Sequence, residues 1–273
     1  MLFDSHCHLD PAYLPAGPDE VLARARAAGV LGVVSIGVGR DLAAARAAVA
    51  LADRRADVFA TVGMHPHDAT ALDGAMMDEL AELARHPRVV AVGEVGLDYH
   101  YDHSPRDTQR AVFRAMIALA RTVKKPIVVH TRSAPADTLA ILAEESARDV
   151  GGIIHCFSED RTFAERAFEL DFDVSFSGIL TFKNATAIRE AARFAPSDRI
   201  LVETDSPYLA PVPLRGKPCE PSYIVHTARC LADIRGVSLD AIGEATTKNA
   251  ARRLALAHAG PAAHDPRRMS FPA

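Results

Sequence analysis

The chain has 273 residues, and its 31 Lys and Arg against 35 Asp and Glu give a formal net charge of −4 with histidine neutral. With 49% hydrophobic and 24% charged residues it has the composition of a folded globular protein, which excludes disorder as the main state. The acidic balance excludes a globally basic surface for non-specific nucleic-acid binding. Its 12 histidines are many for this length, and histidine is the commonest metal ligand.

The N-terminal segment and the cysteines indicate the cellular compartment. Residues 1–6 show no basic region followed by an apolar stretch, so we expect no signal peptide. No apolar run approaches the roughly 18–20 residues that span a bilayer. Cys7, Cys156, Cys219 and Cys230 form neither CxxC pairs nor a disulfide framework, which fits reduced thiols. We predict a cytoplasmic protein with no membrane association and no obligate protein partner.

Short β-rich runs alternate with longer helical patterns along the chain. The predicted strands are, in order, 1–4, 30–38, 58–63, 88–94, 126–130, 152–155, 172–177 and 199–204. The predicted helices are 18–28, 41–55, 74–85, 106–122, 135–148, 161–170, 184–194 and 221–235, with a further helix at 246–257 covering an end or side of the domain. Asp41 is the expected N-cap of its helix. Strands that alternate with helices indicate parallel strands joined by crossovers.

This pattern predicts one α/β domain. Eight strand–helix units in about 250 residues favour a (β/α)8 TIM barrel over an open doubly wound sheet. No GxGxxG follows the first strand, which weakens the dinucleotide-binding alternative. We expect the barrel to occupy residues 1–259, and residues 260–273, which show no periodicity, to form a flexible C-terminal tail.

Histidines and carboxylates gather where the predicted strands end. They are His6, His8, His65, His67, Glu94, His130, His155, Glu203 and Asp205. In a barrel the C-terminal ends of the strands surround one mouth, where the chemistry takes place. Burying so many ionisable groups together is costly unless something neutralises them. The sequence therefore predicts a metal centre at this mouth.

The number of candidate ligands indicates two divalent ions. The sequence offers more candidate ligands than one four-coordinate site that keeps a position open for water can use. The six candidates are His6, His8, Glu94, His130, His155 and Asp205. We predict that Glu94 bridges the ions, that His6, His8 and Asp205 hold one, and that His130 and His155 hold the other. Side chains alternate along a strand, so Cys7 is expected to point away from His6 and His8. The mixed ligands suit Zn²⁺, Mn²⁺ or Fe²⁺, whereas Mg²⁺, also a candidate, usually prefers more oxygen.

Longer motifs connect these residues in a fixed order. They are FDSHCHL (3–9), GMHPHDA (63–69), VGEVGLDYH (92–100), PIVVHTR (126–132), HCFS (155–158), FSGILTFKN (176–184), ETDSPYLAP (203–211) and RGK (215–217). The set resembles the TatD family of metal-dependent hydrolases in the amidohydrolase superfamily and covers nearly the whole chain. The resemblance implies a TIM-barrel deoxyribonuclease, often described as a 3′→5′ exonuclease. It also implies the same six metal ligands and an active-site role for Glu203.

Two segments depart from the family pattern. RGK usually continues into Asn-Glu-Pro, whereas here it is followed by Pro218, Cys219, Glu220 and Pro221. HCFS is commonly followed by Gly, and Glu159 stands there instead. Because both positions are expected on loops near the mouth, they bear on substrate recognition rather than on metal binding.

The predicted reaction is hydrolysis of a DNA phosphodiester by a metal-activated water, with Asp205 as the proton acceptor and Glu203 assisting. His65, Arg132 and Lys217 are predicted to hold phosphate oxygens. Because the net charge is acidic, we expect engagement of single strands or 3′ ends rather than long tracking along DNA.

Two other functions are weighed against this one. The same two-metal centre could hydrolyse a carboxylic ester such as an aminoacyl-tRNA linkage. Glu94 stands where some amidohydrolases carry a carboxylated bridging Lys, which weakens a resemblance to those enzymes. The second alternative is a binding protein that has lost catalysis, and the six intact ligand types disfavour it.

Overall fold

The computed structural model of the chain describes residues 1–10, 14 and 17–256. The predicted C-terminal tail, 260–273, and the last residues of the predicted domain, 257–259, lie outside the described residues. The expectation of a flexible tail therefore stays a prediction.

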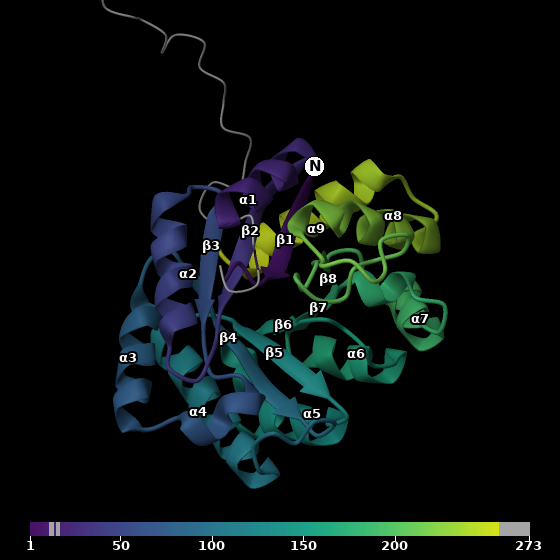
Figure 1. Cartoon of the computed structure of the whole chain (residues 1–273). Coiled ribbons are helices and arrows are strands. Elements are labelled where there is room, and N and C mark those ends of the chain that lie inside the picture. The colour runs from purple at the N-terminus through teal and green to yellow at the C-terminus, as the bar shows by residue number, and fades with distance from the viewer. Residues whose placement is uncertain (11–13, 15–16, 257–273) are drawn as a thin grey trace, which may run out of the picture.

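Eight parallel strands form one sheet in the order β1 to β8 (Figure 1). The strands are β1 (Leu2–Cys7), β2 (Val30–Gly37), β3 (Val58–Val62), β4 (Val89–Asp98), β5 (Ile127–Arg132), β6 (Gly152–Ile154), β7 (Phe172–Phe176) and β8 (Ile200–Val202). The Asp205 amide donates to the His6 carbonyl at 2.9 Å, and the His8 amide to the Ser206 carbonyl at 2.7 Å. These bonds bring the C-terminal ends of the first and last strands together, which confirms the predicted (β/α)8 TIM barrel.

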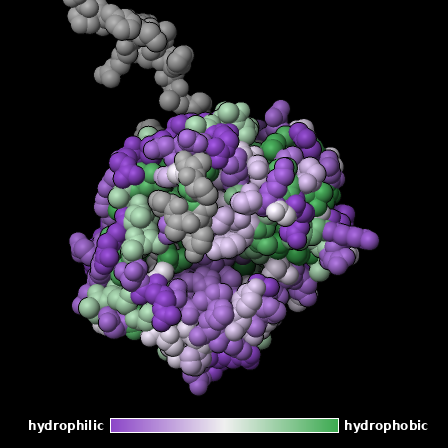
Figure 2. All heavy atoms as spheres, viewed as in Figure 1, coloured by the Kyte–Doolittle hydropathy of each residue, from purple (hydrophilic) through white to green (hydrophobic). Residues whose placement is uncertain are grey.

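Helices follow the strands and surround them (Figure 1). They are α1 (Gly17–Ala27), α2 (Ala43–Arg54), α3 (Gly74–Arg85), α4 (Arg106–Val123), α5 (Pro135–Glu144), α6 (Arg161–Glu169), α7 (Thr186–Phe194), α8 (Ile224–Arg235) and α9 (Leu239–Arg253). Short 3₁₀ turns complete the loops: η2 (Pro66–Ala71), η3 (Ala147–Asp149), η4 (Gly178–Thr181) and η5 (Pro221–Tyr223). No helix within the described ranges is long and apolar enough to cross a membrane. On the face shown in Figure 2, apolar residues form separate patches among polar ones.

Two apolar layers hold the barrel together, and alternation along each strand separates them. Val33 packs in the layer between strands and helices, whereas its neighbour Val34 packs inside the barrel. The interior layer also includes Leu254 and Leu256, which follow α9. The C-terminal end of α9 therefore closes the barrel at the N-terminal ends of the strands and leaves the opposite mouth for the polar side chains.

Several predicted helix boundaries are wrong, three of them for local reasons. The last helix begins at Leu239 instead of 246, because Ser238 caps it by accepting a bond from the Ala241 amide at 3.1 Å. Leu42, in the left-handed region with φ of 58°, takes the N-cap position predicted for Asp41. The Asp41 carboxylate still accepts a bond from the Ala43 amide at 3.0 Å, one position outside the cap. The helix predicted to end at 148 ends at Glu144 and gives way to η3.

The fourth strand runs four residues beyond its predicted end at Glu94. A register shift between Gly93 and Val95 places Glu94 as an extra residue opposite β5, and such bulges redirect side chains. Gly96 has a φ of +139°, and a Cβ there would lie 2.0 Å from the His130 carbonyl oxygen. Glycine at this position lets β4 pass close to β5, so that Glu94 and His130 come together.

Candidate metal centre

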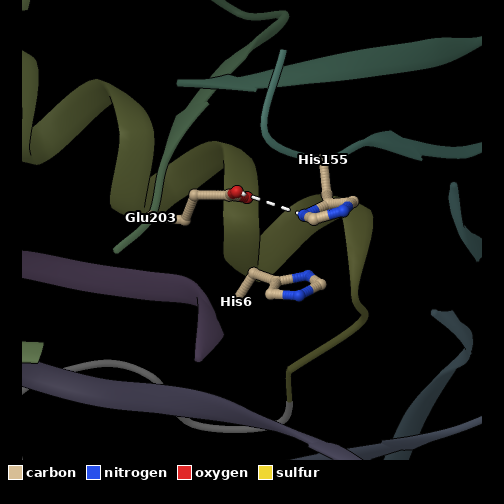
Figure 3. A group of neighbouring side chains, drawn as sticks. All are labelled: His6, His155 and Glu203. Atoms are coloured by element: carbon tan, nitrogen blue, oxygen red, sulfur yellow. Dashed lines mark hydrogen bonds and ion pairs between the residues drawn. The ribbon is translucent and has the colours of Figure 1, made fainter. Parts of the chain in front are cut away.

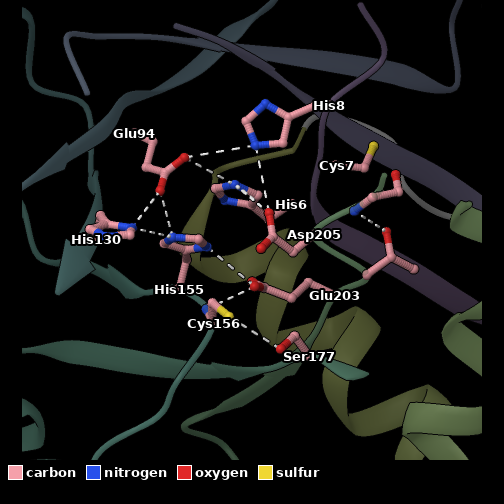
Figure 4. A network of polar contacts seen from close by, with 12 residues as sticks. His6, Cys7, His8, Glu94, His130, His155, Cys156, Ser177, Glu203 and Asp205 are labelled. Carbon is pink, nitrogen blue, oxygen red and sulfur yellow. Dashed lines mark hydrogen bonds and ion pairs between the residues drawn. The ribbon is translucent and has the colours of Figure 1, made fainter. Parts of the chain in front are cut away.

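Glu94 connects four histidines of the polar cluster at the mouth (Figure 4). Its Oε1 is 2.8 Å from His130 Nδ1 and 2.7 Å from His155 Nε2. Its Oε2 is 3.4 Å from His6 Nε2 and 3.8 Å from His8 Nε2. The two carboxylate oxygens therefore face different histidines, which is the arrangement expected of a bridging ligand.

Asp205 completes the group around His6 and His8. Its Oδ1 is 3.7 Å from His6 Nε2 and 3.6 Å from His8 Nε2. The three residues offer ligand atoms that all lie within 4.8 Å of one another. Cys7 lies in the outer apolar layer and its thiol donates to the Val34 carbonyl at 3.4 Å, so the predicted alternation along the first strand is observed.

Glu203 lies behind His155 and fixes its ring (Figure 3). The fully buried Glu203 Oε1 accepts a bond from the Cys156 amide at 2.7 Å and lies 3.3 Å from His155 Nδ1. With the His155 proton on Nδ1, its Nε2 keeps a lone pair toward Glu94, as a metal-binding histidine requires. The His6 ring stacks on His155, with centroids 3.9 Å apart. Glu203 also offers a ligand atom within 4.8 Å of those of His6 and His155, so these three residues form a further group that could hold a metal ion.

Asp98, which the sequence analysis missed, holds His130 in the same way. Its Oδ2 lies 3.2 Å from His130 Nε2 and 2.9 Å from His67 Nε2. Burial opposes ionisation, but the bonds from His130, Tyr101 and His67 lower the Asp98 pKa below its usual value. The anionic Asp98 accepts the His130 Nε2 proton, which leaves His130 Nδ1 as the ligand atom. The available signal was its position four residues after Glu94 in the VGEVGLDYH motif.

His65 reaches the cluster as a hydrogen-bond donor. Its Nδ1 accepts a bond from the His67 amide at 3.2 Å, so its proton is on Nε2, 3.4 Å from Glu94 Oε1. Burial lowers the pKa of His65 to about 4, which keeps the ring neutral. His65, Glu94 and His130 offer ligand atoms within 4.8 Å of one another. Because its only lone pair is taken by a backbone amide, His65 fits a donor to substrate better than a metal ligand.

The two other predicted substrate-binding residues lie at the rim. Arg132 is exposed, and its guanidinium carbon is 4.7 Å from the centroid of the Tyr101 ring. Lys217 is exposed in the loop between β8 and η5, where its amide donates to the Leu214 carbonyl at 3.2 Å. The structure thus brings His65 into the cluster and leaves these two cations outside it.

The two departures from the family pattern occupy different environments. Cys219 is buried, with 1% of its surface exposed, and its amide bonds to the Pro207 carbonyl at 2.9 Å. Glu159 is partly buried, which raises the pKa of its carboxyl. Cys219 therefore belongs to the packing beneath the loop.

The electrostatics of the cluster favour a cation. Burial opposes ionisation of Glu94, but His155 and His65 hold its pKa well below the usual range. Burial likewise opposes ionisation of Asp205, yet the bond from His8 and the nearby His6 lower its pKa. Burial, together with His155, lowers the pKa of His6 and favours its neutral form. Burial lowers the pKa of His8, His130 and His155, but the neighbouring carboxylates raise it by more, so protons on these rings balance the carboxylates and a bound divalent ion would take their place.

Atoms without partners test whether a metal fits these residues. Within the described part of the chain, both ring nitrogens of His6 and Glu203 Oε2 are buried without a hydrogen-bond partner. Buried polar atoms in native proteins are rarely left so. In the same described part, the ion pairs of Glu94, Glu203 and Asp205 are all with histidines. A divalent ion bound by His6 would give one of its unpaired ring nitrogens a partner and would balance the negative charge of the carboxylates. The residues therefore fit a metal.

Comparison with known proteins agrees with this geometry. The family described as TatD related DNase matches residues 3–255. The uncharacterized metal-dependent hydrolase YabD of Bacillus subtilis (strain 168) is 41% identical over 252 residues, covering 92% of this chain and 98% of the relative. The 3′-5′ ssDNA/RNA exonuclease TatD of Klebsiella pneumoniae (strain 342) is 34% identical over 240 residues, covering 86% of this chain and 90% of the relative. The crystal structure of YjjV, a TatD homologue from Escherichia coli K12, superposes with a TM-score of 0.87 at 25% identity, covering 94% and 98% of the two chains.

The barrel with its mouth of histidines and carboxylates defines a metal-dependent hydrolase. The chain belongs to the TatD-related DNase family. The resemblance inferred from the motifs is thereby confirmed, and the His, Glu and Asp clusters indicate divalent-metal binding.

Proposed function

We propose that this hydrolase cleaves phosphodiester bonds of DNA, removing nucleotides from the 3′ ends of single strands. The proposal rests first on the position of Glu94, whose two carboxylate oxygens face two separate groups of ligand atoms. A two-metal centre is suited to displacement at phosphorus, because it can stabilise both the attacking and the leaving oxygen. The family description and the name of the Klebsiella relative support a nucleic-acid substrate.

Two divalent ions, Mg²⁺, Mn²⁺ or Zn²⁺, would be held by the six predicted ligands. His6, His8 and Asp205 would hold one ion, and His130 and His155 the other, with Glu94 between them. Glu203 and Asp98 would keep the His155 and His130 rings in the ligating tautomer.

The chain's own residues would then act on water and phosphate. When bound, the ions would lower the pKa of a water and neutralise charge that develops on the phosphate. Asp205, at the mouth, would accept the proton of the attacking water. His65, a neutral donor at Nε2, would donate to a phosphate oxygen. Arg132 and Lys217 at the rim would meet neighbouring phosphates.

The overall charge sets the mode of engagement. At a net charge of −4 the surface offers few cationic contacts for a long nucleic acid. Local cations at the mouth suit binding of a strand end. This substrate fits the predicted cytoplasmic location.

A labelled oligonucleotide tests the proposal. We expect protein stripped of metal by a chelator to be inactive, and protein reloaded with Mg²⁺, Mn²⁺ or Zn²⁺ to shorten a 5′-labelled single strand stepwise from its 3′ end. A parallel reaction with an aminoacyl-tRNA ester tests the other ester chemistry of the same centre. If the protein hydrolyses that ester and leaves the DNA uncut, the proposal is overturned.

A further inference from the structure

Two half-exposed tyrosines stand at the mouth. Tyr101 follows β4 and Tyr208 follows β8, and each has 50% of its surface exposed. Both stand in motifs that also supply residues of the metal centre, VGEVGLDYH and ETDSPYLAP, but at positions that the metal centre does not use. Phe194, an exposed aromatic residue away from the mouth, ends α7 and is covered by Arg161, 3.9 Å from its ring centroid.

Tyr208 borders the His8 and Asp205 side of the cluster. Its ring meets the His8 ring edge to face, with centroids 6.0 Å apart and an interplanar angle of 78°. Its amide donates to the Asp205 carbonyl at 2.9 Å, which fixes the tyrosine next to that residue.

Tyr101 borders the opposite side of the cluster, beyond His130. Its amide donates to Asp98 Oδ1 at 2.9 Å, and its ring meets the His67 ring edge to face at 5.5 Å. Asp98 in turn contacts His130. The guanidinium of Arg132 lies over the Tyr101 ring, and the His103 ring lies parallel to it with centroids 5.5 Å apart, so aromatic rings and a permanent cation stand together on this side.

From this placement we propose that Tyr101 and Tyr208 bind unpaired nucleobases on either side of the scissile phosphate. The inference rests on the proposed function and names the groups that would select single strands. Histidines and carboxylates around a metal can recognise only the phosphate. Exposed aromatic rings add stacking to any base, without sequence preference, and reach only bases that are not paired in a duplex. Arg132 would pair with the phosphate beside the base that contacts Tyr101.

Removing single bases from the substrate tests the inference. The variants are Y101A and Y208A, with Y101F and Y208F as controls that keep the ring and F194A as a control away from the mouth. Each metal-loaded variant is assayed on intact oligothymidylate and on two modified strands. Each modified strand carries one tetrahydrofuran abasic residue, one strand on the 5′ side of the cleaved bond and the other on the 3′ side. Because stacking of a base on one aromatic ring strengthens binding by about 5- to 150-fold, we expect each alanine variant to raise KM for the intact strand about tenfold.

The outcomes separate the two proposals. We expect the phenylalanine variants and F194A to keep the wild-type KM. On the strand that lacks the base its ring would contact, each alanine variant should have the same KM as the wild type. An equal rise in KM on the intact and the abasic strands would show that the rings support the structure of the site instead of binding bases. An unchanged KM of the alanine variants would overturn the inference and leave the proposed DNA cleavage standing. A wild-type protein that leaves DNA intact would overturn the proposed function itself.

Discussion

The two ends of the barrel bury charges in opposite ways. At the N-terminal ends of the strands, Arg253 donates four hydrogen bonds to Asp171 and Asp173. Arg199 lies 2.9 Å from the fully buried Asp173. At the mouth, by contrast, the buried carboxylates meet histidines, and in the described chain His6 has both ring nitrogens unpartnered.

The difference shows which end is complete without a ligand. Arginine is permanently charged, so Asp171 and Asp173 are neutralised by the chain itself and the cluster serves stability. The charge of histidine depends on a proton that it can release, so a cation from outside can take over the neutralisation of the carboxylates at the mouth. The N-terminal end closes the fold, and the mouth is built to bind metal.

The largest expected effect is on turnover at the mouth. Asp205→Asn keeps the size of the side chain but removes the proton acceptor and a ligand charge. We expect kcat to fall about 10²- to 10⁴-fold, the usual contribution of a general base, with little change in the thermal midpoint. Steady-state kinetics and thermal unfolding of the metal-loaded variant measure this. Near-wild-type turnover would contradict the proposed mechanism.

A change at the other end should affect stability and leave catalysis unchanged. Arg253→Met removes the cation that bonds both Asp171 and Asp173, of which Asp173 is fully buried. Breaking a buried ion pair costs about 3–5 kcal/mol, so we expect a loss near 3 kcal/mol because Arg199 and Arg252 remain. Denaturant unfolding measures the loss. A drop in metal content or in kcat of the folded variant would show that the two ends are coupled.

The histidine-orienting carboxylates should tune metal affinity. Asp98→Asn removes the acceptor for His130 Nε2 and keeps the side chain's shape. We expect the metal dissociation constant to rise about 10- to 100-fold, the usual cost of losing such a partner. Competition with a chromogenic chelator measures the constant. Asp137→Asn, at a carboxylate that bonds Tyr99 away from the cluster, is the matched control and should leave it unchanged.

The smallest expected effect is on acid stability. Hydrogen bonds from Arg253 lower the pKa of Asp171 in the folded state below its ordinary value. Its contribution is therefore present above pH 3.8 and is lost as the pH falls through the folded-state pKa. We expect Asp171→Asn to be less stable than wild type near neutral pH and to approach it in acid. The gap should be small because the side chain is 45% exposed, and a gap that widens in acid would contradict the assignment.

The sequence predicts the barrel and the metal residues for the same reason. Apolar periodicity marks each strand–helix unit, and the C-terminal ends of parallel strands meet at one mouth, so polar residues at those ends converge. His130 and His155 come together although 25 residues separate them.

Features that depend on long-range geometry escape sequence analysis. The bulge at Glu94 arises from pairing with β5, and ending the strand there hid Asp98. The role of His65 is set by the direction of one backbone amide, which residue types do not reveal. The start of α9 was missed for a simpler reason, since the Ser238 cap is visible in the sequence.

The most direct test of the incomplete mouth is the metal content of the purified protein. Elemental analysis of protein reloaded with Zn²⁺ or Mn²⁺ and freed of excess ion should give two ions per chain. Arg253→Met should keep both ions, and Asp205→Asn should lower the content or the affinity. A wild-type protein that retains no divalent ion, or binds it equally after all six mouth ligands are replaced, would contradict the account.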